Sequence, residues 1–284
     1  KLVLPQVIIF ENVHGFTVNF KGKKGTKQYS SYVERALRRL GYKTMHQIVD
    51  MSEYGVPQNR KRFILVAMRD YFPKDVFETL ARNKDAFCLS KGISCTTSIK
   101  DAISDLEQAN GSMPSPDTKG FMAGTYGPEQ SGYQRLMRSG IETTGLIADS
   151  HRFVNHRKNT IKLHKELLEK APVGKRITPS DNIVENLNRR GVTVLDANAQ
   201  APTVTSIPDE LVHYKEPRIL TVREHARIQS FPDWFEFKGQ YTSGGKRRKQ
   251  EVPRYTQVGN AVPPLFAEQV GLAILEVLSH EQPK

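Results

Sequence analysis

The sequence predicts an α/β protein in which half of an open sheet is followed by a smaller, irregular domain. Residues 7–10 form a continuous apolar run, which is typical of a buried parallel strand. A helical pattern and two segments rich in β-forming residues follow this run. From about residue 74 the periodic pattern weakens, and it returns only near the C-terminus.

The helix that follows the first strand carries its own start and stop signals. Ser31 and Glu34 have the spacing of a capping box, and apolar residues recur at helical spacing as far as Leu40. Gly41 stands where a helix C-terminus commonly places a left-handed residue. We therefore expect a helix from about 32 to 40 that ends at Gly41.

Two strands are predicted next. Segments 42–51 and 62–68 are rich in β-forming residues, and Gly55 and Pro57 between them mark a turn. We expect these strands to be neighbours at an edge of the sheet. The first strand would then present an unpaired apolar edge, which is an aggregation site unless another chain covers it.

The rest of the chain divides into two parts. Between about 74 and 215, short helical stretches at 98–106 and 159–170 alternate with segments rich in Gly, Pro and Ser. We expect this region to be a separate domain. The predicted division is 1–73, 74–215 and 216–284.

Order returns in the last part of the chain. Thr221 and Glu224 have the spacing of a second capping box, ahead of a helix that we expect to reach about Ser230. Residues 244–250 read as a loop with four consecutive cations, and apolar spacing over 264–278 predicts a last amphipathic helix.

Composition limits the class of protein. The chain has 284 residues, of which 42 are Lys or Arg and 30 are Asp or Glu, so its formal net charge is +12. This excess suggests a polyanionic partner such as nucleic acid. No apolar run approaches the roughly 20 residues of a membrane helix. Cys88 and Cys95 are too few for an all-cysteine zinc site, and we expect two ordinary thiols, a reducing compartment and no metal.

A carboxylate and two guanidinium groups stand where chemistry is expected. Glu11 ends the first strand, and open α/β sheets bind ligands outside the carboxyl ends of their strands. Arg60 and Arg62 enter a later strand two residues apart, so they should share a face that suits a phosphate or a base oxygen. The structural alternatives are an exposed strand end and a basic guard on an edge strand.

Three further segments are distinctive. Segment 218–232 places many charged residues on a short helix, and by itself this predicts an ion-paired structural helix. Segment 257–264 resembles a tight turn into a helix N-terminus, where free backbone amides can bind a small polar ligand. Segment 151–158 interleaves basic side chains with one aromatic residue, which suits either a solvated face or contact with nucleic acid.

In their order along the chain, these segments resemble the later motifs of the cytosine-5 DNA methyltransferases of bacterial modification systems. Residues 11–13 resemble the sixth motif of that family, 58–62 the eighth, 218–232 the ninth and 257–264 the tenth. Residues 201–205 resemble the end of its target-recognition domain. The resemblance implies part of a Rossmann-like, S-adenosylmethionine-dependent methyltransferase sheet and a smaller target-recognition domain.

The chain departs from the family in one respect. The glycine-rich turn that binds S-adenosyl-L-methionine and the Pro-Cys dipeptide that supplies the nucleophile do not occur in it, and Cys88 and Cys95 follow the eighth motif. The resemblance therefore implies a C-terminal portion, inactive in isolation, whose missing motifs lie on an N-terminal stretch or a partner subunit. The alternative is a non-catalytic DNA-binding remnant of such an enzyme.

The resemblance also implies roles for single residues. Glu11 would be the acid that neutralises N3 of a flipped cytosine while a thiolate adds to C6, which requires a raised pKa in a dry pocket. Arg62 would hold O2 of the base or the nearby backbone, and Arg60 a phosphate. Asn260 and Val262 would close the cofactor pocket.

The implied partner is double-stranded DNA, whose major groove the region from 74 to about 205 would read. The candidate DNA-binding residues are Arg152, Arg157, Thr203 and Thr205. The resemblance places the protein with DNA in the bacterial cytoplasm, in a restriction–modification system.

Overall fold

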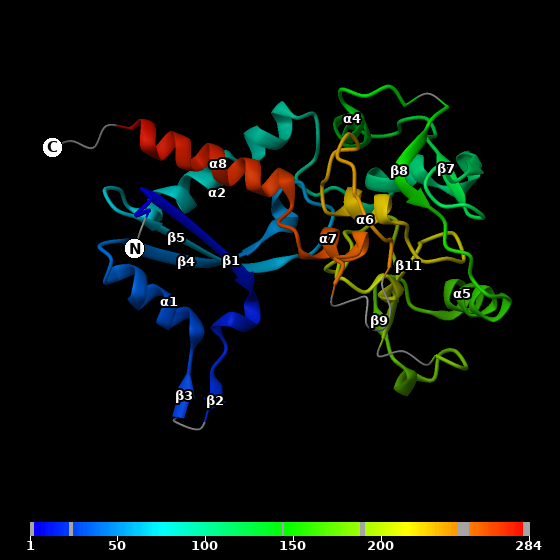
Figure 1. Ribbon diagram of the computed structural model, residues 1–284, viewed down its shortest axis with the longest axis horizontal. Helices are drawn as coiled ribbons and strands as arrows, with labels where there is room; N and C mark the ends of the chain where they lie inside the picture. The colour runs from blue at the N-terminus through cyan, green and yellow to red at the C-terminus, as the bar shows by residue number, and fades with distance from the viewer. Residues whose placement is uncertain (1–2, 23–24, 144, 188–190, 243–249, 281–284) are drawn as a thin grey trace.

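Two lobes lie side by side along the long axis of the molecule (Figure 1). The computed structural model describes residues 3–22, 25–143, 145–187, 191–242 and 250–280. The first lobe is a three-stranded sheet with helices on both faces, and the second is built from short strands and helices. The predicted α/β class is confirmed.

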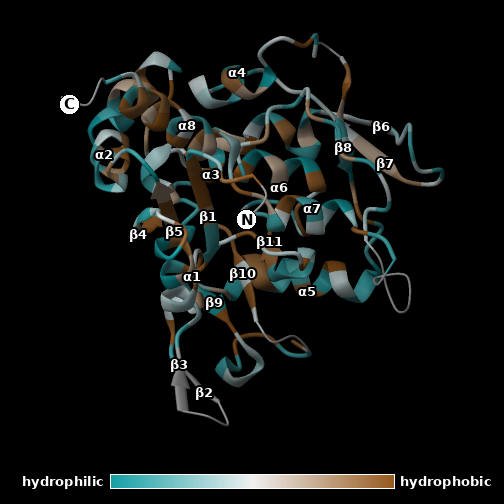
Figure 2. Ribbon diagram, turned by 60° about the vertical axis from the view of Figure 1, so that its left-hand side comes forward, coloured by the Kyte–Doolittle hydropathy of each residue, from teal (hydrophilic) through white to brown (hydrophobic). Residues whose placement is uncertain are grey.

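The sheet of the first lobe has the order β1-β5-β4, and both pairs of strands are antiparallel. Its strands are β1 (Val7–Val13), β4 (Lys43–Asp50) and β5 (Lys61–Met68), so both later strands are confirmed. The expectation of a buried parallel first strand is wrong. Strand β5 takes the centre of the sheet, and β1 lies half-exposed beside it. In Figure 2, β1 changes from brown to teal toward its carboxyl end, where polar residues follow the apolar run.

Strand β5 is buried on both faces, so its side chains supply two cores. Alternate residues of a strand point to opposite sides. One side packs against α2 (Pro73–Ser90) and α8 (Pro264–Ser279), and the other lies over α1 (Tyr29–Arg38). The two sets are Ile64, Val66 and Met68, and Phe63, Leu65 and Ala67.

Helix α1 begins earlier than its capping pattern predicts. Ser31 lies inside the helix and its hydroxyl donates to the side chain of Gln28 (2.7 Å), so the predicted capping box does not form. The stop signal is confirmed, because Gly41 has a φ of 87° just after the helix ends. A short hairpin of β2 (Phe20–Gly22) and β3 (Gly25–Lys27) precedes α1.

Helix α2 leads from the sheet toward the second lobe. It packs on α8, β4 and β5, so residues as far as Ser90 lie with the first lobe, and the domain boundaries stay a prediction. A disulfide joins Cys88, in the last turn of α2, to Cys95 in the following loop, with Cα atoms 5.6 Å apart. The expectation of two ordinary thiols is wrong, because the turn at the end of α2 brings the two side chains together.

The second lobe contains two small sheets and five short helices among the residues that the structure describes. The sheets are β6-β7-β8 and β11-β10-β9. Their strands are β6 (Ser112–Pro114), β7 (Met122–Thr125), β8 (Ile147–Arg152), β9 (Arg176–Ile177), β10 (Val192–Val194) and β11 (Leu211–Val212). The helices are α3 (Ile99–Ile103), α4 (Gly132–Arg138), α5 (Lys158–Lys170), α6 (Val222–Ile228) and α7 (Arg254–Asn260). The predicted helical stretches at 98–106 and 159–170 are confirmed by α3 and α5.

Single turns of 3-10 helix connect several of these elements. They are η1 (His14–Thr17), η2 (Met51–Tyr54), η3 (Ser104–Leu106), η4 (Gln108–Asn110), η5 (Pro179–Asp181) and η6 (Pro208–Glu210). The first two belong to the first lobe, and η2 forms the predicted turn between β4 and β5.

Helix α6 is the buried centre of the second lobe (Figure 1). The predicted capping box is confirmed, since the Thr221 amide donates to the Glu224 carboxylate (2.7 Å) and the Glu224 amide donates to the Thr221 hydroxyl (3.2 Å). The predicted ion-paired helix is also confirmed. Arg218 donates to both carboxylate oxygens of Glu224, and Arg227 donates to both Asp105 and Asp233.

The C-terminal segment is only partly as expected. Helix α8 confirms the predicted last helix, but residues 257–260 are the end of α7, and only 261–263 form an extended link into α8. Residues 254–279 are long and apolar enough to cross a membrane. They form two helices, of which α8 packs its apolar side in the core of the first lobe. Residues 244–249 of the predicted cationic loop lie outside the described residues.

Removing Arg227 should destabilise the second lobe. The Arg227→Met variant leaves Asp105 and Asp233 buried with weaker pairing, so we expect a loss of about 3–5 kcal/mol in the free energy of unfolding, measured by urea denaturation. Arg135→Met, on the exposed side of α4, is the control and should change it by less than about 0.5 kcal/mol. Equal effects of the two changes would contradict the role given to Arg227.

Stability should fall on mild acidification. Burial lowers the pKa of His151 and His225 to about 4 and that of His213 to about 3. The unfolded chain binds these protons below about pH 6.5 while the folded chain does not, so each histidine removes up to about 1.4 kcal/mol of unfolding free energy per pH unit between about pH 6.5 and 4. Urea denaturation at several pH values tests this, and a flat profile in that window would contradict it.

Candidate functional site

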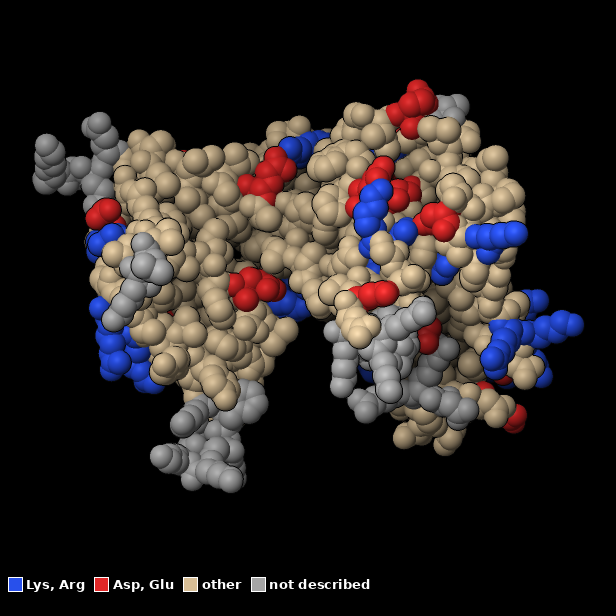
Figure 3. Space-filling view, viewed as in Figure 1, with Lys and Arg blue, Asp and Glu red and all other residues tan. Residues whose placement is uncertain are grey.

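The predicted site residues of the first lobe lie at its boundary with the second. In the antiparallel register Val13 pairs with Arg62, so the C-terminal end of β1 and the N-terminal end of β5 lie side by side at the same end of the sheet. Figure 1 shows α7 beside this edge, and Figure 3 shows the surface hollowed between the two lobes. A ligand in this hollow would face both lobes.

Glu11 and Arg62 form an ion pair on one face of the sheet. Glu11 pairs with Ile64 in the register, which is the same face as Arg62, and the Arg62 Nε lies 3.1 Å from the Glu11 Oε1. The Glu11 side chain is 25% exposed and the Arg62 side chain is 12% exposed. Burial lowers the pKa of Arg62, and the carboxylate of Glu11 opposes that shift. The pair can offer a carboxylate and a guanidinium edge to one planar polar ligand.

Arg60 is a buried clamp between three segments. Its side chain is 2% exposed, and it donates to the carbonyl oxygens of Val204 (3.2 Å), Gly259 (3.2 Å) and Ala261 (3.0 Å). Burial lowers its pKa to about 10. A guanidinium used in this way positions the backbone, and this placement argues against the predicted phosphate contact.

Two glutamines that the sequence analysis did not single out lie beside this clamp. Gln58 and Gln229 are fully buried, and the amide nitrogen of Gln58 donates to the side-chain oxygen of Gln229. Gln229 in turn donates to the carbonyls of Val258 (3.1 Å) and Ala261 (2.6 Å). The signal that could have found them is an amide side chain that directly follows an apolar residue, Pro57 or Ile228, in each of two motif segments.

The predicted cofactor residues lie on the link between α7 and α8. Asn260 is exposed at the end of α7, and Val262 packs partly against the core. Gly259 allows a close approach here, because a Cβ atom at this position would lie 2.5 Å from the backbone of Thr205. The link therefore presents an exposed carboxamide beside a half-exposed apolar side chain.

The two predicted threonines use their hydroxyl groups within the chain. Thr203 donates to the carbonyl of Asn59 (2.6 Å), and Thr205 donates to the carboxylate of Glu210 (2.7 Å). Both side chains are half-buried. The segment 201–205 is thereby fixed against the start of β5.

The two predicted arginines belong to the second lobe. The Arg152 guanidinium, at the end of β8, lies over the rings of Phe121 (4.1 Å) and Tyr241 (3.7 Å), and burial lowers its pKa. Arg157 is exposed and immediately precedes α5. Only Arg157 therefore presents its side chain to solvent in the way that a phosphate contact requires.

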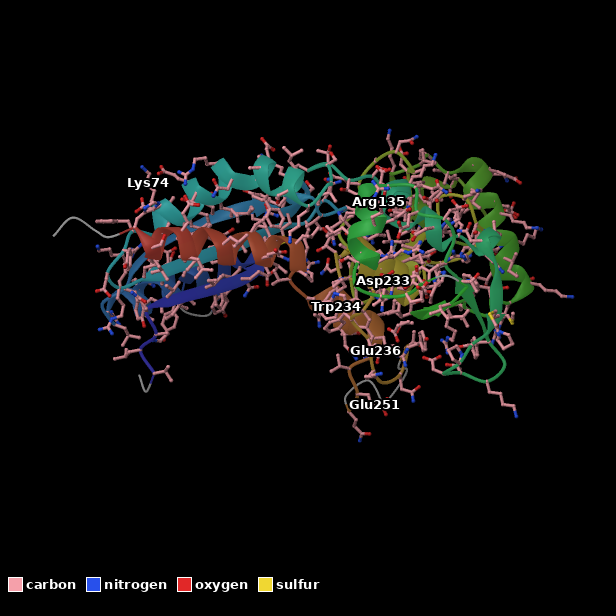
Figure 4. The ribbon with its side chains drawn as sticks, turned by 90° about the horizontal axis from the view of Figure 1, so that it is seen from above. Lys74, Arg135, Asp233, Trp234, Glu236 and Glu251 are labelled. Atoms are coloured by element: carbon pink, nitrogen blue, oxygen red, sulfur yellow. A yellow bond between two sulfur atoms is a disulfide. The ribbon has the colours of Figure 1, made fainter. Side chains whose placement is uncertain are left out.

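An exposed aromatic side chain stands on the same lobe. Trp234 is 59% exposed and follows the buried Asp233. Figure 4 shows Trp234 on the side of the second lobe that faces the first, with Glu236 and Glu251 farther out.

Comparison with known proteins identifies the family. Residues 1–276 match the family described as C-5 cytosine-specific DNA methylase, so the chain belongs to that family, which confirms the resemblance seen in the sequence. Family membership implies S-adenosyl-L-methionine as the methyl donor.

Curated type II methyltransferases are similar to this chain. Type II methyltransferase M.XorII of Xanthomonas oryzae pv. oryzae is 28% identical over 298 residues, which is 99% of this chain and 61% of that protein. Type II methyltransferase M.AquIB of Picosynechococcus sp. is 39% identical over 132 residues, 45% of this chain and 88% of that protein. The chain thus spans about three fifths of M.XorII.

A solved structure shares the fold. A DNA modification methyltransferase encoded within a prophage of E. coli matches with a TM-score of 0.59 and 21% identity, over 97% of this chain and 70% of that chain. This likeness supports the α/β methyltransferase fold.

Arg60→Lys should destabilise the fold although it keeps the charge. One ammonium group cannot replace a planar fork that serves three carbonyls, so we expect a loss of about 1–3 kcal/mol in the free energy of unfolding, measured by urea denaturation. Arg82→Lys, at an exposed ion pair on α2, should change it by less than about 1 kcal/mol. Unchanged stability in Arg60→Lys would contradict the role of Arg60 as a clamp on the backbone.

Proposed function

We propose that this chain supplies the base pocket and the DNA-reading part of a DNA (cytosine-5-)-methyltransferase. The enzyme methylates C5 of a flipped cytosine at a specific site in duplex DNA. The observation that carries this proposal is the Glu11–Arg62 pair at the lobe boundary, in a chain that belongs to the family over residues 1–276.

In this proposal the ion pair holds the base. The Glu11 carboxyl, once it carries a proton, donates it or a hydrogen bond at N3 of the cytosine, where charge develops during addition at C6. Arg62 fixes the carboxyl through Nε and donates from Nη1 to the Lys61 carbonyl (2.9 Å), so Nη2 is the group placed to hold O2 of the base. Arg60 acts on the backbone that surrounds this pocket.

The link between α7 and α8 holds the cofactor. Asn260 would meet its polar edge and Val262 its apolar surface, and S-adenosyl-L-methionine supplies the methyl group when bound. Arg60 and Gln229 fix the link through the Ala261 carbonyl. These donors keep the pocket in one shape before the ligand arrives, which lowers the ordering cost of binding.

DNA is bound between the lobes in this proposal. C5 and C6 of cytosine lie inside the duplex stack, so the base must be flipped out to reach Glu11. The hollow in Figure 3 offers room for a strand, and the net charge of +12 favours a polyanion. We assign DNA reading to the region 74–215, with Arg157 as its most accessible candidate contact. The type II names of the relatives support a role in restriction–modification, which would place the enzyme with bacterial DNA in the cytoplasm.

The nucleophilic thiolate and the glycine-rich cofactor turn come, in this proposal, from a segment outside these 284 residues, on the same polypeptide or on a partner. Cys88 and Cys95 are joined to each other at the end of α2. Within the described residues β1 pairs only with β5, and Ile9 and Val13 on β1 are 49% and 54% exposed. This strand edge can receive a further strand from that segment.

Glu11→Gln should abolish most methyl transfer. In the enzyme completed with the nucleophile-bearing segment, we expect the rate to fall at least about 100-fold, because a positioned acid is lost. Incorporation of labelled methyl groups into duplex DNA measures it, and Glu53→Gln, at the exposed residue of turn η2, should leave the rate unchanged. An unaffected rate in Glu11→Gln would remove this residue from the mechanism. If the completed wild-type enzyme binds DNA in a salt-sensitive way but does not methylate it, that result would support the alternative of a non-catalytic DNA-binding remnant.

A further inference from the structure

We infer that Gln58 and Gln229 form a hydrogen-bond relay that couples the DNA-reading segment to the cofactor-binding link. The identity of the two ligands rests on the proposed function. The relay itself rests on contacts within the chain.

The relay runs in one direction through two side-chain amides. The backbone N–H of Val204 donates to Oε1 of Gln58 (3.1 Å), and Nε2 of Gln58 donates to Oε1 of Gln229. Nε2 of Gln229 then donates to the carbonyl of Ala261 (2.6 Å). Each donor therefore points from residue 204 toward residue 261.

Burial makes the orientation of each amide depend on the other. Both side chains are fully buried, so no solvent can replace a lost partner. Rotating the side-chain amide of Gln58 by 180° would place its NH₂ group against the Val204 N–H and its oxygen against the Gln229 oxygen. A polarised chain of this kind is stronger than its separate bonds, and it resists a change at either end.

Both ends of the relay lie between predicted ligand contacts. Val204 stands between Thr203 and Thr205, and Ala261 stands between Asn260 and Val262. The side chains of Gln58 and Gln229 alone connect these two ends by hydrogen bonds.

The two segments also touch directly. Gly259 leaves no room for a Cβ atom against the backbone of Thr205, and Arg60 bridges the carbonyls of Val204 and Ala261. A shift of the 203–205 segment on DNA must therefore be transmitted to the link at 261–263. Through this coupling, bound DNA changes the affinity for the cofactor, and the cofactor changes the affinity for DNA by the same factor.

The relay can be tested by changing Gln58, which does not touch the link. The Gln58→Met variant keeps the side-chain volume but removes the bond to Gln229, together with the bonds to the Val204 N–H and the Ile228 carbonyl (3.1 Å). We expect amide hydrogen exchange over 257–264 to accelerate about five- to 150-fold, the range typical of coupling between two sites. In the completed methyltransferase, the KM for S-adenosylmethionine should rise by at least about fivefold while kcat changes less than about twofold.

Gln134→Met is the matched control. Gln134 is also fully buried and donates to the Lys100 carbonyl (3.3 Å) and the Ser104 hydroxyl (2.9 Å), but it lies on α4. It should lose a similar amount of stability without a change in exchange over 257–264 or in KM. If Gln58→Met does not fold, Gln58→Asn, which is one methylene shorter, carries the same expectation.

The outcomes separate the relay from the proposed function. Unchanged exchange over 257–264 in the Gln58 variant, or equal acceleration in the Gln134 control, overturns the relay. Accelerated exchange with an unchanged KM overturns the coupling to the cofactor. If the completed wild type transfers no methyl group, the proposed function fails, and hydrogen exchange still decides whether the relay exists.

Discussion

The second lobe depends on burying the arginines of one short segment together with the acids that neutralise them. Arg223 and Arg227 are fully buried and Arg218 nearly so. Removing a charge from water is costly unless it is paired and hydrogen-bonded. Asp105 and Asp149 come from parts of the chain far from α6, so their pairs with Arg227 and Arg223 also fix those parts of the lobe to α6. The acids are Asp105, Asp149, Glu216, Glu224 and Asp233.

This charge network explains how an irregular lobe holds its shape. The strands of the second lobe are two to six residues long, and short strands give few ladder hydrogen bonds. Charge-assisted bonds are stronger than neutral ones and have defined geometry, particularly when arginine meets a carboxylate with two bonds. The loops of the lobe are thereby placed by α6 rather than by a large sheet.

At the lobe boundary, a buried arginine is again paired by hydrogen bonds, but its partners are neutral. Arg60 faces backbone carbonyls instead of carboxylates, and the two glutamines beside it donate to further backbone carbonyls. The result is a rigid junction that leaves Glu11 and Arg62 at the edge of the hollow. A base pocket at this position would be preorganised. Preorganised polar groups are the ones that most strongly stabilise charge developing in a transition state.

The sequence by itself determined what depends on near neighbours. The capping box at Thr221, the stop at Gly41 and the amphipathic pattern of α8 each involve residues a few positions apart, so local sequence specifies them. The order of the motif segments likewise identified the family. What sequence reasoning assigned wrongly or missed was the central place of β5, the pairing of Cys88 with Cys95 and the start of α1.

Only the tertiary structure decided what Arg60 and the two glutamines do. The partners of Arg60 lie 144, 199 and 201 residues away along the chain, and Gln58 meets Gln229 across 171 residues. A guanidinium or amide group can bind a ligand or a backbone carbonyl equally well, and its type alone does not distinguish the two. The choice is made by which segments the fold brings within hydrogen-bond distance, and for these residues that is the backbone of their own chain.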